Sequence, residues 1–251
     1  LFEQSWAYFQ IDDFSKALGN IHTINAPYFE NHFFPESYIL RAVIYFMNCL
    51  FTQSKEAIVE FNAKYPPLKK EIDSFRKQYK DPAEFYEYAL RIKRRKAGLS
   101  GAVGRMARTS LSDRQLMKTF KYVDELTREL KQVQTADPAW KATAIAGVVL
   151  QDLTLQKSLA QNEAGQMAQR RIARVSSEIQ DLIKQGIKVE YETIRGFKDK
   201  LEASLRNEQV SHTTRKDQTT IEPDEEHLYW PFDGQYWRDE LGYYRFRIKT
   251  R

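Results

Sequence analysis

Hydrophobic side chains recur every three or four positions along most of this sequence, which is the period of an amphipathic helix. Over residues 1–80 the pattern is divided into short pieces, the first of which carries Phe14, Leu18, Ile21 and Ile24. The pieces begin or end near Pro27, Pro35, Pro66 and Pro67. Because proline disrupts a helix interior, we expect short paired helices bounded at these positions, and a further amphipathic helix over 82–96.

Two of these pieces look like copies of one unit. In each, an alanine (Ala17, Ala57) is followed four residues later by a large apolar residue (Ile21, Phe61), with a proline beyond. This resembles the second helix of a tetratricopeptide (TPR) unit, in which a small residue lets paired helices approach. The alanines are further apart than the 34 residues of such a unit, which implies an insertion around 28–34. We therefore expect residues 1–96 to form TPR-like helical repeats. Since three or more units normally form a stable stack, we expect them to be the last units of a longer array.

Residues 97–109 hold three glycines and few large apolar side chains, which predicts a flexible connector. A long apolar stripe then starts after Ser110, and Asp137-Pro138 supplies the cap and first-turn proline of another helix. This tight join predicts an antiparallel, coiled-coil-like helical hairpin over 110–205. Gly186 and Gly196 are the expected kinks of its second helix.

The second helix of the hairpin carries more apolar surface than its sequence neighbour can cover. Its expected stripe comprises Ile145, Val148, Leu155, Leu159, Ile172, Val175, Ile179, Leu182, Ile187, Tyr191, Ile194, Phe197, Leu201 and Leu205. An unbroken helix of this extent is about 100 Å long, and the preceding helix covers only the first third or so. The N-terminal repeats, the C-terminal tail or a second chain must cover the rest. Self-association through this helix therefore stays open.

The C-terminal part changes character twice. Residues 206–226 are polar and predict a linker, whereas residues 227–251 are rich in aromatic side chains. Asp233-Gly234 signals a turn, and 244–248 alternate as in a strand, so we expect a small β-hairpin-like tail that packs on the long helix. The candidate packing or partner-binding residues of this tail are Tyr229, Trp230, Phe232, Tyr236, Trp237 and Tyr243.

The 251-residue chain has a net charge of only +5, but its cations are not evenly spread. Between Tyr86 and Lys121, ten Lys and Arg residues face only two acidic residues. The candidate binding residues in this basic cluster are Arg91, Arg94 and Arg95. A solvated helix end explains such a cluster, and so does contact with an anionic lipid surface or an acidic protein. Nucleic acid is disfavoured, because no aromatic residues interleave with the cations and no known binding motif is present.

No pattern for catalysis, for a metal or for a cofactor is visible. The sequence has no HExxH, CxxC, P-loop or GxSxG motif, and its four histidines are scattered. Its one cysteine, Cys49, lies in an apolar run and is read as a core residue. We therefore expect a protein that is not an enzyme and has no cofactor. No apolar stretch reaches 18 residues, so no transmembrane span is expected. The first residue is Leu1, which suggests a piece trimmed from a longer protein.

The order of these parts is similar to the C-terminal portion of TPR proteins in the cell envelope of gliding and predatory deltaproteobacteria. The tail from Tyr229 to Tyr244 carries the specific part of this resemblance, and Glu56 to Pro66 is similar to periplasmic TPR units. The resemblance implies a non-enzymatic protein–protein scaffold in the periplasm or at the outer membrane, within a surface-assembly or motility complex. Its partner is not implied. A binding module for cell-wall glycan or anionic lipid, using the aromatic tail or the basic cluster, is the alternative.

Overall fold

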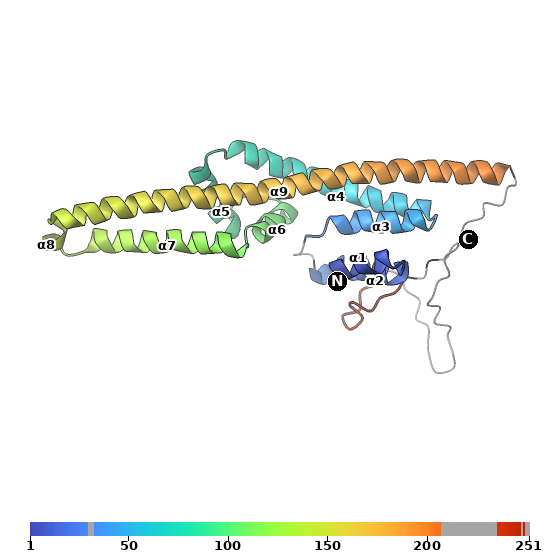
Figure 1. The fold of residues 1–251 in the computed structure, drawn as a ribbon, viewed down its shortest axis with the longest axis horizontal. Helices are drawn as coiled ribbons and strands as arrows, with labels where there is room; N and C mark the ends of the chain where they lie inside the picture. Colours follow the sequence, from blue (N-terminus) through green and yellow to red (C-terminus); the bar gives the residue numbers. More distant parts are fainter. Residues whose placement is uncertain (30–32, 207–234, 247, 249–251) are drawn as a thin grey trace. The chain divides into compact units, whose positions relative to one another are not determined.

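The computed structural model describes residues 1–29, 33–206, 235–246 and 248 (Figure 1). Throughout these residues the regular structure is helical, which confirms the predicted all-α class. The helices are α1 (Phe2–Gln10), α2 (Phe14–Ile24), the 3-10 turn η1 (Pro27–Phe29), α3 (Glu36–Met47), α4 (Phe51–Gln78), α5 (Pro82–Lys93), α6 (Gly101–Ser110), α7 (Arg114–Thr135), α8 (Pro138–Lys141) and α9 (Ala144–Leu205). None of these helices is long and apolar enough to cross a membrane.

The chain divides into two compact units. Unit 1 consists of residues 1–66 and 181–251, and unit 2 consists of residues 67–180. The division passes through two helices, between Pro66 and Pro67 in α4 and between Gln180 and Asp181 in α9. These boundaries differ from the segments that the sequence pattern suggested, because α4 and α9 each supply residues to both units.

Helix α4 corrects one expectation, since it continues through Pro66 and Pro67 instead of ending there. Each proline removes a helical hydrogen bond and costs about 3 kcal/mol or more. The compensation lies in one continuous apolar face. Its residues are spaced three or four apart on both sides of the prolines and are all buried: Ile58, Phe61, Tyr65, Leu68, Ile72 and Phe75. Breaking the helix would take this face out of register with its neighbours.

Unit 1 is built on a core shared by α1, α2 and α3. Asp13 caps α2 by accepting a hydrogen bond from the Lys16 amide at 3.1 Å. The fully buried part of this core comprises Phe14, Ala17, Leu18, Ile21, Leu40 and Ile44. Ala57 and Phe61, the matching pair in the predicted repeat, are also buried. The burial of both pairs agrees with the TPR-like signature, but the repeat relationship itself stays a prediction.

Unit 2 contains a helix where the sequence suggested a flexible connector over 97–109. Helix α6 starts behind Ser100, whose side chain accepts a hydrogen bond from the Val103 amide. The Ser100 amide in turn donates to Glu71 at 2.9 Å, which ties this start to α4. Val103, Met106 and Ala107 are buried on one face of α6. The connector prediction was wrong because a face of small side chains still packs closely against its neighbours.

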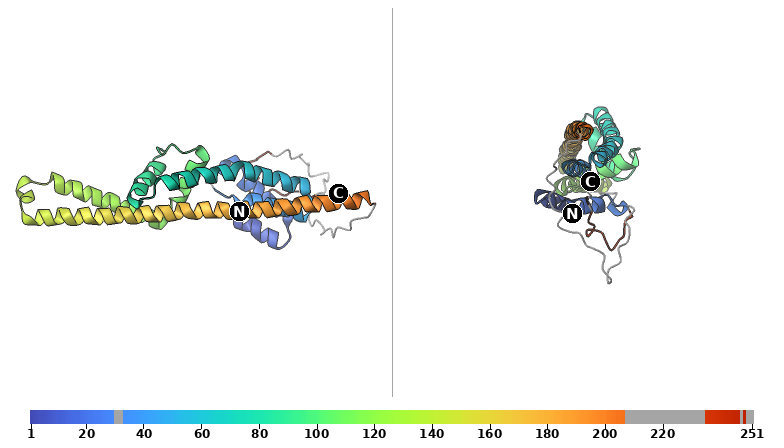
Figure 2. Two further views of the ribbon diagram at one scale, coloured as in Figure 1. Left: turned by 90° about the horizontal axis from the view of Figure 1, so that it is seen from above. Right: turned by 90° about the vertical axis from the view of Figure 1, so that its right-hand side faces the viewer.

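The antiparallel hairpin of α7 and α9 is confirmed, and Figure 2 shows the two helices running side by side. Asp113 at the start of α7 pairs with Arg171 at 2.8 Å, whereas Tyr122, further along α7, bonds to Gln156. Residues later in α7 therefore contact residues earlier in α9, as in an antiparallel pair of helices. The join follows the predicted chemistry: Asp137 accepts a hydrogen bond from the Ala139 amide, and α8 starts with Pro138.

Helix α9 runs for 62 residues, about 93 Å at the usual rise per residue. It is unbroken at Gly186 and Gly196, so the expected kinks are absent there. Both glycines instead permit close packing in unit 1. A β-carbon at Gly196 would lie 2.7 Å from the Phe51 ring, and one at Gly186 would lie 3.4 Å from Ile39. At these two positions glycine therefore serves close contact and not bending.

Candidate interaction surfaces

The most prominent surface feature is the hydrophobic character of α9. Among the described residues, 21 large hydrophobic side chains are exposed, and eleven of them lie on this one helix. In unit 1 they form a stripe, here called the seam, with 46% to 86% of each side chain exposed. The seam consists of Ile187, Tyr191, Ile194, Phe197, Leu201 and Leu205. An apolar stripe at this spacing is what a helix presents to a partner.

The packed face of α9 in unit 1 is a different one. Thr193 lies 3.0 Å from the hydroxyl of Ser54, which also donates to the Ala42 carbonyl at 2.9 Å. These buried contacts, together with Gly196 against Phe51, join α9 to α3 and α4. The helix therefore has one face occupied within unit 1 and a neighbouring apolar face that stays largely exposed, with the Phe197 ring at their border 6.4 Å from the Phe51 ring.

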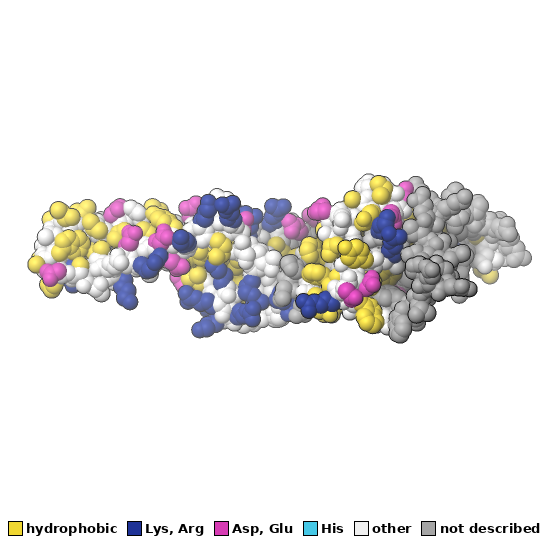
Figure 3. All heavy atoms as spheres, turned by 90° about the horizontal axis from the view of Figure 1, so that it is seen from below, with side chains coloured by type: hydrophobic (Ala, Val, Ile, Leu, Met, Phe, Trp, Pro, Cys, Tyr) yellow, Lys and Arg dark blue, Asp and Glu magenta, His cyan; other side chains and the backbone are white. Residues whose placement is uncertain are grey.

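In unit 2, α9 likewise has a buried face and an exposed apolar face. This arrangement differs from the packing that was expected for the hairpin. Leu155 and Leu159 are 58% and 61% exposed, although α7 runs alongside them. The buried residues of α9 in this unit are Ala146, Ala160, Ala164, Gly165, Ala168, Ile172, Ser176 and Ile179. Small side chains therefore make up much of the buried face of α9 in this unit, and they allow neighbouring helices to approach closely. Figure 3 shows hydrophobic side chains gathered at the closed end of the hairpin.

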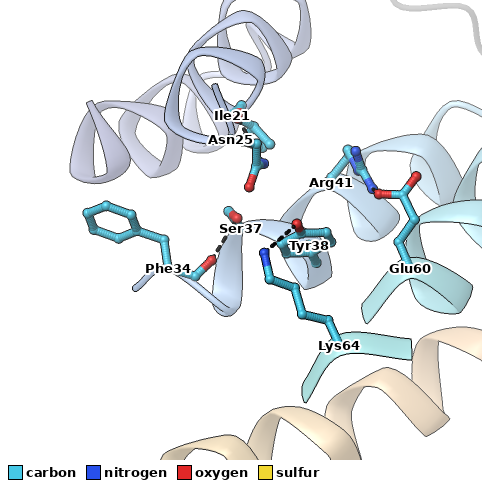
Figure 4. Close-up of polar contacts among 8 residues, drawn as sticks. All are labelled: Ile21, Asn25, Phe34, Ser37, Tyr38, Arg41, Glu60 and Lys64. Carbon is cyan, nitrogen blue, oxygen red and sulfur yellow. Dashed lines mark hydrogen bonds and ion pairs between the residues drawn. The ribbon is translucent and has the colours of Figure 1, made fainter. Parts of the chain in front are cut away.

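A cluster of charged and aromatic side chains links α3 to α4 in unit 1 (Figure 4). Arg41 forms an ion pair with Glu60 and lies 5.2 Å from the centre of the Tyr38 ring. Lys64 donates a hydrogen bond to the Tyr38 hydroxyl at 3.2 Å. Burial raises the pKa of the nearby Tyr65 phenol, which therefore stays neutral. Because the arginine is already paired with a carboxylate, this cluster joins two helices and is a weak candidate for a ligand site.

The described residues 235–246 of the tail pack on α2, whereas the tail was expected to pack on the long helix. The Tyr236 ring stacks on His22 at 4.2 Å, and the rings of Tyr244 and Phe246 lie 4.9 Å and 5.5 Å from the same imidazole. The Phe246 amide donates to the Ser15 carbonyl at 3.2 Å. Residues 235–246 contain no strand. Residues 238–243 form a bend and a turn, in which the Tyr243 amide donates to the Glu240 carbonyl at 2.9 Å, so the β-hairpin expectation fails for this part.

Burial of His22 lowers its pKa below the ordinary value of 6.5, and the hydrogen bond to the Gln235 carbonyl opposes this only in part. Of the predicted tail residues, Tyr236 is half-buried in this contact. Trp237 and Tyr243 are 49% and 78% exposed. Tyr229, Trp230 and Phe232 lie outside the described residues. The tail therefore combines aromatic residues used for docking with others that face solvent.

The predicted basic cluster is partly used for packing within unit 2. The Arg91 guanidinium lies 5.2 Å and 5.5 Å from the rings of Tyr88 and Tyr79. Lys93 lies 4.5 Å from the centre of the Phe120 ring, and burial lowers its pKa. Arg94 and Arg95 follow directly after the end of α5 and are exposed. Two of these cations thus support aromatic rings, and two face solvent.

Unit 2 contains a cavity of about 500 Å³ that was not expected from the sequence. Its lining comes from the end of α4, the start of α5 and the middle of α9, and it includes Asp73, Arg76, Lys77, Tyr79, Lys80, Phe85, Gln169, Arg170 and Ala173. The available signal was a run of cations at the end of α4 and a second run on α9. These runs lie about 90 positions apart, so nothing in the linear pattern brings them together.

In the described part of the chain, no three His, Cys, Asp or Glu side chains are grouped so that they could hold a metal ion. Comparison with known proteins found no match: no family model, no curated protein and no solved structure resembles this chain. Any account of its function must therefore rest on the surfaces described above.

Proposed function

We propose that this chain is a non-enzymatic scaffold that binds a protein partner along α9. The observation that carries this proposal is the seam. Burying a half-exposed large apolar side chain contributes about 1 kcal/mol, so six of them supply about 6 kcal/mol before the costs of association. A partner helix with its own apolar stripe is the natural occupant of such a surface.

The short helices of unit 1 support the same role. If α1 to α4 are TPR-like units, they would hold α9 on one side and present its seam on the other. The location in a bacterial envelope, within a surface-assembly or motility complex, rests on the resemblance of the tail and of Glu56 to Pro66 to TPR envelope proteins. We keep it as part of the proposal.

A triple substitution of the seam tests the proposal. The variant carries Ile187→Gln, Ile194→Gln and Leu201→Gln. These changes replace three apolar side chains of the seam with glutamine, which favours a helical backbone. The matched control replaces three exposed hydrophobic residues elsewhere in unit 1 with the same amide: Ile11→Gln, Met47→Gln and Val59→Gln. Both variants should melt near the wild-type temperature, because all six side chains are exposed.

The partner is detected with a photo-reactive amino acid at Tyr191, within the seam, and in a parallel variant at Val59. In source cells, a defined cross-linked species should form from position 191 and not from position 59. The seam triple substitution should abolish this species, and the control substitution should leave it. Equal cross-linking from both positions, or a species unaffected by the seam substitutions, would show that the seam is not the binding surface.

A second candidate function, glycan binding, is favoured by the exposed aromatic rings of Trp237 and Tyr243, since such rings stack on sugars. Sedimentation with purified peptidoglycan tests it. The protein should co-sediment, and Trp237→Ala with Tyr243→Ala should release it. Retention of the double variant would exclude the tail as the glycan site.

A further inference from the structure

The cavity in unit 2 holds more positive charge than its surroundings neutralise. Four cations line it, namely Arg76, Lys77, Lys80 and Arg170, against the single carboxylate of Asp73. Asp73 is already committed to Lys69 at 2.5 Å, to Arg76 at 3.3 Å and to the Ser176 hydroxyl at 2.6 Å. Burial alone would raise its pKa, but these hydrogen bonds and charges lower it, so Asp73 is ionised and paired.

The positive charge of the other three cations is not neutralised by Asp73. Within the described residues, Lys77, Lys80 and Arg170 have no carboxylate within 4.0 Å. All three side chains are exposed, and their only hydrogen bond within the described residues is the weak one from Arg170 to the Gln166 side chain at 3.4 Å, so they can reach a ligand. Like charges gathered around one cavity repel one another, and a bound anion relieves that repulsion.

The backbone around the cavity does not oppose an anion. The carbonyl groups of Tyr79 and Lys80, at the end of α4, would present negative charge to the site. The Gln169 side-chain amide donates to both, at 3.4 Å and 2.9 Å, and thereby occupies them. This leaves cationic side chains as the main polar groups available to a ligand.

The walls of the cavity are held firmly. Helix α9 passes so close to the start of α5 that a β-carbon at Gly165 would lie 1.8 Å from the Pro82 carbonyl oxygen. Tyr79 stacks on Tyr88 at 4.1 Å, which fixes an aromatic surface beside the cations. The volume of about 500 Å³ is within the usual range for small-molecule sites.

From these observations we propose that the cavity binds a phosphate-bearing molecule, with its phosphate between Lys77, Lys80 and Arg170 and its remaining part against Tyr79. A multiply charged tetrahedral anion uses several cations at once, and arginine can bind it through two nitrogen atoms. The phosphate can belong to a soluble molecule or to a lipid headgroup. The proposal is independent of the seam and of the scaffold role.

The test compares two triple variants that lose the same charge. The cavity variant is Lys77→Gln, Lys80→Gln and Arg170→Gln. The control, Arg128→Gln, Lys131→Gln and Lys141→Gln, removes three exposed cations of the same unit that lie outside both the cavity and the basic cluster. Inorganic pyrophosphate is titrated into each protein in a calorimeter at low salt. A parallel experiment measures co-sedimentation with vesicles that contain phosphatidic acid, using pure phosphatidylcholine vesicles as the reference.

We expect saturable binding of at least one probe by the wild-type protein. The cavity variant should bind about tenfold or more weakly, and the control variant should bind within about twofold of the wild type. Pyrophosphate binding indicates a soluble ligand, and vesicle binding without pyrophosphate binding indicates a headgroup. No saturable binding of either probe, or equal losses in both variants, would overturn the proposal. Because all six substituted side chains are exposed, both variants should melt near the wild-type temperature, and this measurement checks that they are folded.

Discussion

Replacing Gly165 with alanine should destabilise unit 2, although alanine is the better helix former. The added β-carbon would lie 1.8 Å from the Pro82 carbonyl oxygen and 2.5 Å from its carbon, whereas real contacts stay above 3.0 Å. Because the obstacle is backbone and not a flexible side chain, α9 or the start of α5 must move. Overpacking of this kind costs about 3 kcal/mol, and the gain in helix propensity returns about 1 kcal/mol. The expected net loss is about 2 kcal/mol.

Gly147 provides the matched control, since it lies in the same helix and the same unit. A β-carbon there has no heavy atom within 4 Å, so Gly147→Ala should stabilise the protein by about 0.5–1 kcal/mol. The two variants should differ by nearly 3 kcal/mol in urea unfolding followed by circular dichroism. In melting temperature this corresponds to about 6–12 °C for a chain of this size. If Gly165→Ala were as stable as Gly147→Ala, the close approach of α9 to Pro82 would be refuted.

Three further predictions concern other contacts. Gly19→Ala should release the C-terminal segment, because its β-carbon would lie 1.6 Å from a backbone oxygen of that segment; faster amide hydrogen exchange at Phe246 would show this, and unchanged exchange would contradict it. The neutral form of His22 is favoured when the C-terminal segment is docked, because burial lowers the pKa of this histidine. The contribution of His22 to docking is therefore present above about pH 6.5 and is lost as the pH falls. The protection factor of Phe246 should therefore decrease between about pH 7 and pH 5, and His22→Gln should remove this dependence. Asp73→Asn should lower the free energy of unfolding in urea by about 1–2 kcal/mol, because it weakens the contact of this residue with α9. The difference from the wild type should shrink as the pH falls below 3.8, the ordinary pKa of the aspartate carboxyl.

The helices themselves were largely predictable, because their signals are local. Asp13, Asp81 and Asp137 each precede a helix and each accept a backbone hydrogen bond at its first turn. Such caps act within three or four residues, so the linear sequence holds all the information that they need. The apolar period of α2 and α7 is equally local. These features account for the correct all-α assignment and for the position of the hairpin turn.

The errors in helix boundaries have a common cause. In α4, Pro66 and Pro67 are strong local breakers, yet burial of the apolar face on both sides outweighs them. In α6, glycines and alanines look like a flexible link, yet the Ser100 cap and contacts of Met106 with its surroundings stabilise a helix. In both places tertiary packing overrides local propensity, and packing partners cannot be read from the linear pattern.

The cavity and the docking of the tail were beyond prediction for a related reason. Lys80 and Arg170 are brought to one cavity only by the way α9 packs in unit 2, and each alone looks like an ordinary surface cation. Tyr236 was expected to be buried because a dense group of aromatic residues avoids water. Its partner, His22, could not be foreseen, since many apolar faces were available and hydrophobic burial is not directional.

The most instructive difference lies in which face of α9 is packed. Sequence reasoning chose the face with the largest side chains, Leu155 and Leu159 among them, as the one buried against α7. The structure buries Ala160 and Ala164 instead and leaves both leucines more than half exposed. Alanine contributes little hydrophobic surface of its own, but it lets two backbones approach so that the large side chains of α7 fill the space. The packing of the hairpin therefore does not require Leu155 or Leu159. Since exposed apolar stripes are rarely kept on a monomer surface without a partner, the stripes at both ends of α9, of which the seam is one, support the protein partner proposed above.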